Sequence, residues 1–436
     1  MLIITWIGYS AYTMARRPFS VGRSEIERST GISKFASSMV DTSFLIFYTI
    51  GQLLYGSHIK GYLSSKNILA LGLLGSACCC AVIAVSSSSV LFVISWGANG
   101  AFQAVGWASC ISVVTPWLSS SERGAIMGLW GTNMAAGGIA GNALSGYLLG
   151  YGGWRAAFMT NGMIMLIVVG ILHFLLKSHP NAEGILSPQQ LAEGRSVHEL
   201  VGSCSTVDGE CVFGDSEQPS SEKKGLPGSQ LSLRETLCIP GISGVAASYF
   251  FHKLVRYCLM FWLPYYFNRE LHYTPSMAGY ASAALDLGGV AGSVIGGYFS
   301  DWYCDGKRRA TTVNIFSVGM FFSLLGFVLL REFLWTVVGG ATIAFACGFC
   351  AFAVDSLLTT SLLQDIADRQ GAMQHLGAIS GVVGGIGTLG SVFQGVLITV
   401  LSEQSWEILF GSLALLTLLA AGLLTPSIKI ERASKR

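Results

Sequence analysis

Long apolar stretches dominate the chain, and their length restricts its fold more than any other feature. A helix needs about 20 mainly apolar residues to cross the hydrocarbon core of a bilayer. Only 11% of the residues are charged, too few to cover a water-soluble protein of this size. The sequence therefore predicts an all-α integral membrane protein with twelve transmembrane helices, near 2–22, 36–57, 67–86, 90–115, 123–150, 155–176, 240–267, 276–300, 310–330, 334–360, 372–401 and 405–426.

One long polar segment separates the sixth apolar stretch from the seventh. It contains GSCSTVDGECVFGDSEQPSSEKKGLPGS, whose Ser, Gly, Pro and charged residues are typical of a flexible linker. We therefore expect two pseudo-symmetric six-helix bundles joined by a linker. The predicted domains are a first bundle at 1–177, a cytoplasmic linker at 178–238, a second bundle at 239–428 and a cytoplasmic tail at 429–436.

The basic residues predict an orientation. One side of the predicted bundle carries most of them, namely Lys60, Lys66, Arg123, Lys177, Lys223, Lys224, Lys307, Arg308, Arg309, Arg369 and the tail IKIERASKR. The opposite loops are expected to hold Arg23, Arg28, Lys34, Arg155, Arg269 and Arg331. The positive-inside rule then places both termini and the linker in the cytoplasm. The first apolar stretch has no basic region before it, so we interpret it as a span and not as a signal peptide.

Two arginines occupy matching positions within the apolar stretches. Arg16 and Arg256 lie 240 positions apart, each about fifteen residues into the first helix of its half, and the same offset separates Gly56 from Gly296. Such weak internal symmetry is typical of transporters built from repeats. A charge at the bilayer centre costs between about 3 and more than 10 kcal/mol, so a compensating role is expected.

Two interpretations of these arginines differ in what the side chains reach. Arg17, next to Pro18, could extend its charge to the membrane interface. For Arg16 and Arg256 we favour a shared central cavity, where two guanidinium forks suit a phosphate or carboxylate. The intramembrane acids could instead neutralise them. Asp286 is expected to orient packing or a gate, and Asp355 either pairs with an arginine or carries a proton.

With these residues in view, nearly the whole chain resembles the major facilitator superfamily. More narrowly, it is similar to the organophosphate:phosphate antiporter family, which exchanges glycerol 3-phosphate or sugar phosphates. The resemblance rests on GYSAYTMARRPFSV, NGAFQAVGWASCISVVTPWLSSSERGAIMGLWGTN, KLVRYCLMFWLPYYF and DLGGVAGSVIGGYFSD, the last of which resembles the eukaryotic sugar-phosphate branch in particular.

The resemblance implies roles for several residues. Arg16 and Arg256 fall on the paired phosphate-binding arginines of the family, Arg17 on the neighbouring basic residue and Tyr9 on a cavity tyrosine. Lys253 lies one helical turn before Arg256, on the same face. The chain departs from bacterial members, which carry a histidine where this chain has Asn133 and Met134, and a lysine where it has Gln52.

Further polar residues are candidates for the cavity or for a gate. Gln103, Trp107 and Asn133 could read the organic part of a substrate or join helices by hydrogen bonds. The superfamily's loop motif is degenerate in its first copy, GSHIKGYLSSKN, which lacks the acidic residue. Its second copy, GGYFSDWYCDGKRR, keeps Asp301 and a basic cluster with Arg308, and we interpret it as a conformational latch in preference to a solvated loop.

The predicted function is exchange of a phosphorylated metabolite, a sugar phosphate or glycerol 3-phosphate, for inorganic phosphate by alternating access. We expect no enzyme activity, cofactor, metal or nucleic-acid partner, because no nucleophile–base pair, metal cluster or phosphate loop is recognisable. A monomer in an intracellular membrane such as the endoplasmic reticulum is expected. The alternatives are a proton-coupled organic-anion symporter that uses Asp355, and a membrane sensor of phosphate esters that transports nothing.

Overall fold

The computed structural model describes residues 1–54, 63–118, 123–177, 180, 205–207, 210–212, 233–304, 308–372 and 375–433. Its first half contains α1 (Leu2–Ala15), α2 (Arg17–Thr30), α3 (Lys34–Leu54), α4 (Ser65–Val85), α5 (Ser89–Ala104), α6 (Gly106–Val114), the 3₁₀ turn η2 (Thr115–Trp117), α7 (Arg123–Trp130) and α8 (Asn133–Leu175). Most of the predicted linker and the first loop motif lie outside the described residues. Two short strands, β1 (Ser205–Val207) and β2 (Glu210–Val212), pair antiparallel with Ser205 opposite Val212.

The second half repeats the helical pattern of the first. It contains α11 (Leu233–Cys238), α12 (Ile242–Arg269), α13 (Pro275–Cys304), α14 (Arg309–Leu329), α15 (Arg331–Leu334), α16 (Val337–Ser356), the π-helical turn η4 (Leu357–Ser361), α17 (Leu362–Arg369), α18 (Leu376–Val392), α19 (Gln394–Gln404), α20 (Trp406–Leu423) and α21 (Thr425–Ala433).

Each predicted apolar stretch is helical in the structure, and the prediction of an all-α membrane fold is confirmed. Consecutive helices share one stretch where the winding is interrupted, as in α1–α2 and α5–α6. The long α8 covers two stretches, because Gly153 adopts a left-handed φ of 71° that bends the chain back. By length and composition alone, six described segments are able to cross a membrane: Ser65–Val85, Asn133–Leu175, Arg309–Leu329, Val337–Arg369, Ile379–Gln404 and Trp406–Glu431.

The first predicted apolar stretch, 2–22, ends several residues before the helix does. The structure continues this helix through α2 to Thr30, so the expectation that Arg23 lies in a loop is wrong. Its side chain is fully buried and forms an ion pair with Asp41 of α3. Because the ion pair satisfies the charge, a polar sequence that looked like a loop continues as helix into the packed interior.

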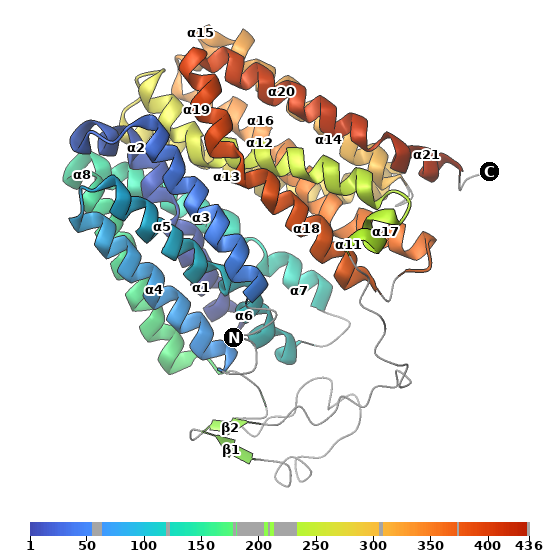
Figure 1. Ribbon diagram of the computed structural model, residues 1–436, viewed down its shortest axis with the longest axis horizontal. Helices are drawn as coiled ribbons and strands as arrows, with labels where there is room; N and C mark the ends of the chain where they lie inside the picture. The colour runs from blue at the N-terminus through green and yellow to red at the C-terminus, as the bar shows by residue number, and fades with distance from the viewer. Residues whose placement is uncertain are drawn as a thin grey trace.

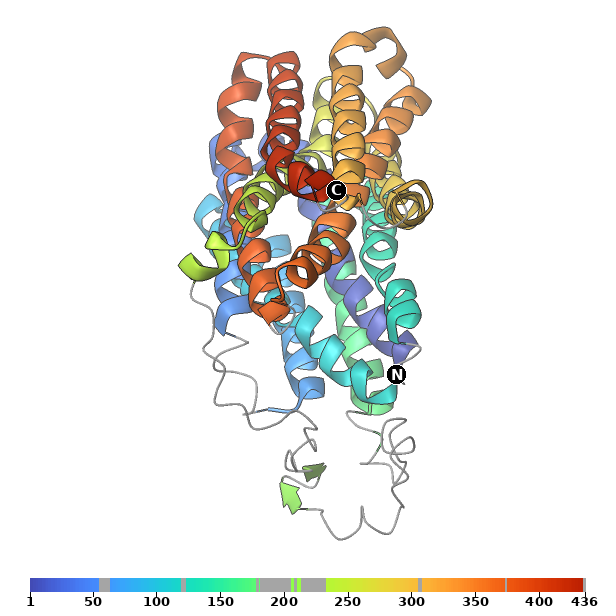
Figure 2. The same ribbon diagram turned by 90° about the vertical axis from the view of Figure 1, so that its right-hand side faces the viewer.

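The two halves are separate bundles that meet at the far end of the molecule and along α8 and α13. Figure 1 shows the blue and green helices of the first half beside the yellow, orange and red helices of the second, and Figure 2 gives the view turned by 90°, in which the two sets overlap. The halves contact each other most extensively where α8 packs on α13, and also where α2 packs on α12 and α3 packs on α19. In Figure 1 the bundles diverge from this closed end toward the end that holds the start of α1 and helix α21. We call the closed end, formed by α2, the start of α3, the end of α12 and α19, the far seam.

Glycines allow the helices within each bundle to approach backbone to backbone. A Cβ at Gly292 of α13 would lie 1.9 Å from the carbonyl oxygen of Phe349 in α16, and one at Gly348 would lie 1.9 Å from that of Leu285. In lipid, where no hydrophobic effect drives helices together, such close van der Waals packing stabilises the bundle. The position of α13 therefore depends on these small residues.

We expect Gly292→Ala to destabilise the protein, while Gly297→Ala on the same helix leaves stability unchanged or raises it. The methyl group at 292 meets the backbone of α16, an overpacking that typically costs about 1–3 kcal/mol. At Gly297 no atom lies within 4 Å of the added Cβ, and alanine gains up to about 1 kcal/mol of helix propensity. Thermal unfolding in detergent compares the two variants, and equal melting temperatures would contradict this packing.

Candidate substrate site between the two halves

Three arginines line one buried pocket at the interface of the two bundles. Arg16 and Arg17 enter it from the first half and Arg256 from α12, and their side chains are among the buried residues. The remaining lining residues are Thr13, Met134, Tyr257, Met260, Asp286 and Phe352. The pocket has a volume of about 20 Å³, which is room for about one water molecule. Any larger ligand therefore requires these side chains to move.

Arg16 is held by a network of neutral side chains. Its Nε donates to the Oε1 of Gln103 at 2.6 Å. The amide nitrogen of Gln103 donates in turn to Ser76 and Asn99, each at 3.1 Å. These two bonds leave only the amide oxygen of Gln103 to face Arg16, and all three supporting residues are fully buried. The Nη2 of Arg16 has no hydrogen-bond partner among the described residues, so a donor is left available.

Arg256 is held by a carboxylate. Its Nη1 donates to Asp355 Oδ2 at 2.6 Å, and Tyr249 donates its hydroxyl to Asp355 Oδ1 at 2.8 Å. The guanidinium group also lies 4.0 Å from the ring centre of Phe352, a cation–π arrangement. One turn earlier, Lys253 donates to the hydroxyl of Thr388 at 2.9 Å. Asp355 thus pairs with an arginine, which was one of the two roles predicted for it.

Arg17 joins the two halves. Its Nη2 donates to Asp286 Oδ1 of α13 at 2.7 Å, and its Nη1 donates to the carbonyl of Met260 at 3.3 Å. The other oxygen of Asp286 accepts from Asn142 of α8 at 3.1 Å. This contact is geometrically close because Gly138 and Gly141 of α8 leave room for the side chains of Arg17 and Asp286. Arg17 therefore has a buried partner and does not extend to a membrane interface.

Local breaks in helix winding lie beside these charged groups. Pro18 lacks a backbone N–H, and the assignment changes from α1 to α2 at Arg16. Gln103 is next to the break between α5 and α6 at Val105. Asp355 lies two residues before the π-helical turn η4, a rare form that is frequent at functional sites. Of these signals, Pro18 is visible in the sequence and the π-turn is not.

The charges around the pocket do not balance. Four basic groups, Arg16, Arg17, Lys253 and Arg256, face two carboxylates, Asp286 and Asp355, so two formal positive charges are in excess. Among the hydrogen bonds described above, the partners of Arg16 and Lys253 are neutral side chains, Gln103 and Thr388. An anion with two negative charges would bring the net formal charge of this group to zero.

The other predicted cavity residues lie in the first half and pack together. Tyr9 is buried, with its ring centre 5.2 Å from that of Trp107, which in turn lies 5.1 Å from Trp130. Asn133 is fully buried and donates to the carbonyl of Trp130 at 2.7 Å. Of the predicted residues, the described part of the chain brings Arg16, Arg17, Arg256, Lys253, Gln103, Asp286 and Asp355 into one network of contacts, with Tyr9, Trp107 and Asn133 beside it.

The predicted latch contains a different arginine. Arg308 is exposed, whereas Arg309 donates to Asp365 at 3.0 Å and to the carbonyl of Ser361 at 3.0 Å. Asp301 lies 3.6 Å from Arg309, with 71% of its side chain exposed. The loop motif thus connects α13, α14 and α17 through Arg309. It remains a prediction that this cluster acts as a latch.

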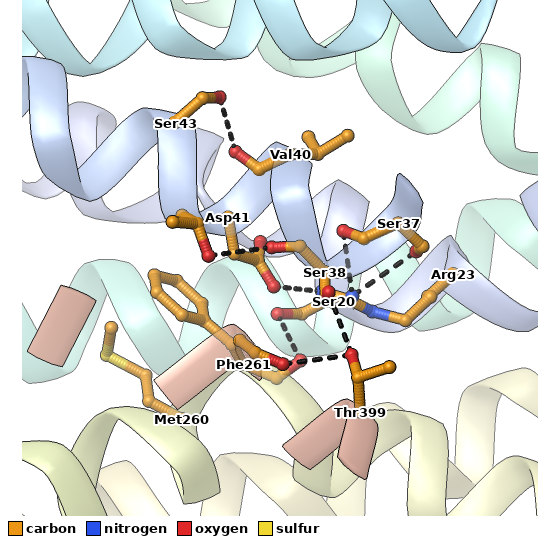
Figure 3. A network of polar contacts seen from close by, with 12 residues as sticks. Ser20, Arg23, Ser37, Ser38, Val40, Asp41, Ser43, Met260, Phe261 and Thr399 are labelled. Atoms are coloured by element: carbon orange, nitrogen blue, oxygen red, sulfur yellow. Dashed lines mark hydrogen bonds and ion pairs between the residues drawn. The ribbon is translucent and has the colours of Figure 1, made fainter. Parts of the chain in front are cut away.

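The far seam is closed by a polar network that sequence reasoning missed. Ser20 donates to the carbonyl of Phe261 at 2.9 Å, and Thr399 donates to the hydroxyl of Ser38 at 2.8 Å, each across the two halves (Figure 3). Arg23, paired with Asp41, lies 3.8 Å from the ring centre of Trp262 in the second half. The alternation of small polar residues in SSMVDTS is the only sequence signal that this segment packs against another helix.

Sequence comparison identifies the class of protein that has this arrangement. The pattern described as Major Facilitator Superfamily matches residues 5–387 and 245–435. The chain belongs to the Major Facilitator Superfamily. The membership confirms the predicted fold of two six-helix bundles. The fold is similar to a solved structure, that of a bacterial homolog to the human lysosomal transporter Spinster in an inward-facing and unoccupied conformation. The TM-score is 0.72 at 13% identity, and the match covers 99% of this chain and 96% of that one.

Relatives of this superfamily member are named as transporters of phosphate esters. It is 26% identical over 481 residues to "Putative glycerol-3-phosphate transporter 1" of Arabidopsis thaliana, covering 100% of this chain and 88% of the relative. It is 24% identical over 448 residues to "Glucose-6-phosphate exchanger SLC37A2" of Xenopus tropicalis, covering 94% and 88%. It is 26% identical over 433 residues to "Probable hexose phosphate transport protein" of Chlamydia trachomatis, covering 99% and 91%. The resemblance to organophosphate exchangers is confirmed, and these relatives are transporters, not enzymes.

We expect Gln103→Glu to weaken phosphate binding at least about 10-fold. The new carboxylate would neutralise Arg16, and a unit charge about 6 Å from a bound anion at an effective dielectric of about 20 costs nearly 3 kcal/mol. Gln103→Met, of similar length and without charge, is the matched control. Titration of purified protein with inorganic phosphate measures both. Equal affinities of the two variants would mean that charge at this position is unimportant.

Proposed function

We propose that this protein exchanges a phosphorylated metabolite, a sugar phosphate or glycerol 3-phosphate, for inorganic phosphate by alternating access. The observation that carries the proposal is the pocket shared by Arg16 and Arg256, one from each half, with two positive charges in excess around it. A phosphate ester is doubly charged near neutral pH, because its second pKa is about 6. Guanidinium groups bind such an anion through two parallel hydrogen bonds.

Binding exchanges one anionic partner for another. The pocket is too small for a phosphate group as it stands, and Asp355 occupies one edge of Arg256. We infer that phosphate displaces Asp355 from Arg256 and accepts a hydrogen bond from Nη2 of Arg16, which has no partner among the described residues. Asp355 keeps its hydrogen bond from Tyr249 and comes to face Lys253, which lies one turn before Arg256 on the same face of α12. Both charged groups then stay paired while the substrate is bound.

Charge balance then explains obligatory exchange. Reorientation must carry the site through a state closed at both ends, where water cannot solvate the excess charge. The empty site would bring two uncompensated positive charges into this low-dielectric state, at a cost of several kcal/mol per ion. The site loaded with a dianion is neutral and moves without that cost. Return to the first side therefore requires a second anion, which is exchange.

Arg17 and Asp286 connect site occupancy to the movement of the halves. Their ion pair bridges the bundles directly beside the pocket, and Arg17 is adjacent to Arg16 in sequence. A shift of Arg16 toward a bound anion would move the backbone that carries Arg17. The proposed role of Asp286 is therefore gating, and that of Arg17 is to link substrate binding with the inter-half contact.

The proposed setting is a multi-pass protein of an intracellular membrane, with termini and linker in the cytoplasm. The distribution of basic residues supports the orientation. The similarity to the exchangers of the eukaryotic branch supports the endoplasmic reticulum in preference to the plasma membrane. We propose that a single chain is the working unit, since one chain already contains both halves of the site.

Proton-coupled symport is the second candidate, and one observation favours it. Asp355 is 26% exposed at its side chain and sits between Tyr249 and Arg256, so a proton has access to a carboxylate at the site. In that mechanism protonation of Asp355 would release Arg256 for the substrate anion. Exchange is favoured because the excess positive charge exists without any protonation step.

The first test is Arg256→Leu in proteoliposomes loaded with phosphate. We expect loss of at least about 100-fold in counterflow of labelled phosphate, because removal of Arg256 deletes half of the proposed phosphate site and one of its charge-assisted donors. Arg331→Leu is the matched control, since Arg331 pairs only with the exposed Glu407. Size-exclusion profiles check folding of both variants, and unchanged uptake by a folded Arg256→Leu protein would refute the proposal.

A second test separates exchange from proton coupling. For exchange, vesicles without internal phosphate should show no uptake of glycerol 3-phosphate under a pH gradient, and Asp355→Asn should slow counterflow, because its loaded site keeps one positive charge, while it lowers the KM for the anion. The lower KM is expected because the variant leaves one more positive charge in excess. Uptake that is driven by a pH gradient and lost in Asp355→Asn would establish symport instead.

A further inference from the structure

A second pocket spans the far seam and shares no lining residue with the arginine pocket. It is lined by Val21, Ser24, Glu25, Arg28, Leu149, Asn268, Arg269, His272, Tyr273 and Pro275. These residues come from α2 and α8 of the first half and from the end of α12 and the turn before α13 in the second half. Its volume is about 450 Å³, within the range of small-molecule sites. We call it the seam pocket.

The seam pocket carries more positive than negative charge. Arg28 enters it from the first half and Arg269 from the second, and His272 adds an imidazole. Neither arginine forms an ion pair with a residue in the described part of the chain. Glu25 is the one acidic lining residue, and it accepts a hydrogen bond from the backbone of Trp154. Arg28 interacts electrostatically with Glu25, and the two exposed arginines, one from each half, outnumber this single carboxylate, so the pocket keeps positive charge for an anion.

The walls of the pocket are held in place. Asn268 donates to the carbonyl of Tyr273 at 2.8 Å, and the hydroxyl of Tyr273 donates to the carbonyl of Thr336 at 2.6 Å, which fixes the turn between α12 and α13. His272 adopts a left-handed φ of 54°, which non-glycine residues rarely do unless the surroundings impose it. The hydroxyl of Ser24 is buried without a hydrogen-bond partner among the described residues. A polar group is thus left for a ligand.

We propose that the seam pocket is a regulatory site for a small dianion of the phosphate class, bound between Arg28 and Arg269. Because its walls belong to different halves, the pocket is complete only while the far seam is closed. A ligand that binds one conformation better than the other shifts the population toward it by the ratio of its affinities. Phosphate in the compartment at this end would therefore hold the seam closed and slow the transport cycle.

Binding of inorganic phosphate to the full chain in lipid-free detergent tests this proposal. The Arg256→Leu background removes the central site, so any remaining phosphate binding is measured alone. We expect binding to persist in that background and to weaken at least about 10-fold when Arg28→Gln and Arg269→Gln are added, since each removes a charge-assisted hydrogen bond. Arg331→Gln, a charge removed from the same end outside the pocket, should leave binding unchanged.

A conformational readout distinguishes seam closure from adventitious binding. Phosphate should slow backbone hydrogen exchange in α2 and in the end of α12 in the Arg256→Leu protein, and not after Arg28→Gln and Arg269→Gln are added. Loss of all phosphate binding with Arg256→Leu alone would overturn the proposal, as would equal exchange rates with and without phosphate. Neither result depends on transport, so the exchange mechanism is judged separately by counterflow.

Discussion

The cost of burying charge in a low-dielectric interior governs this molecule. Each guanidinium group within the helices needs an acceptor, and each acceptor must come from a neighbouring helix. Arg23 has Asp41, Arg17 has Asp286 and Arg256 has Asp355, whereas Arg16 donates to the neutral amide of Gln103. Three of the four positive charges are therefore compensated inside the protein. Arg16 is not compensated in this way, and its charge, together with that of Lys253, supports the proposed anion site.

The same pairing rule separates two kinds of inter-half contact. At the far seam Tyr265 donates to Glu27 across the halves, and the other contacts described above are neutral hydrogen bonds and an aromatic ring facing a cation that is already paired, as with Ser20 on Phe261 and Trp262 on Arg23. The neutral contacts can break and reform without exposing an unpaired charge to lipid. Beside the pocket the contact is an ion pair, Arg17 with Asp286, whose partners lie next to the residues that would meet substrate. Breaking the neutral contacts at the seam therefore costs little electrostatic free energy, whereas movement at the centre depends on the net charge of the site.

Much of the architecture follows from residues that act locally. The apolar stretches fix where helices cross the membrane, and the matched positions of Arg16 and Arg256 predicted a place where the halves meet. Both arginines do line one pocket. The end of the first helix could not be predicted in this way, because the polar segment that contains Arg23 and Glu27 resembles a loop in the sequence. Only the structure shows that Arg23 pairs with Asp41 and that Glu27 accepts a hydrogen bond from Tyr265. Local composition records the polarity of a residue and not the partner that compensates it.

By itself the sequence determined that the protein lies in a lipid bilayer, how many apolar stretches it has, how they divide into two halves and where two arginines lie at equivalent positions. These depend on hydropathy and spacing, which are properties of neighbouring residues. Only the tertiary structure decided which acid pairs with which arginine, that Ser76 and Asn99 orient Gln103, and that Arg28 and Arg269 line the same pocket from different halves. Those pairings join residues that are distant along the chain, and a helix rotated by a fraction of a turn would exchange one partner for another. The packing of glycine-lined helices sets that rotation, and it exists only in the folded bundle.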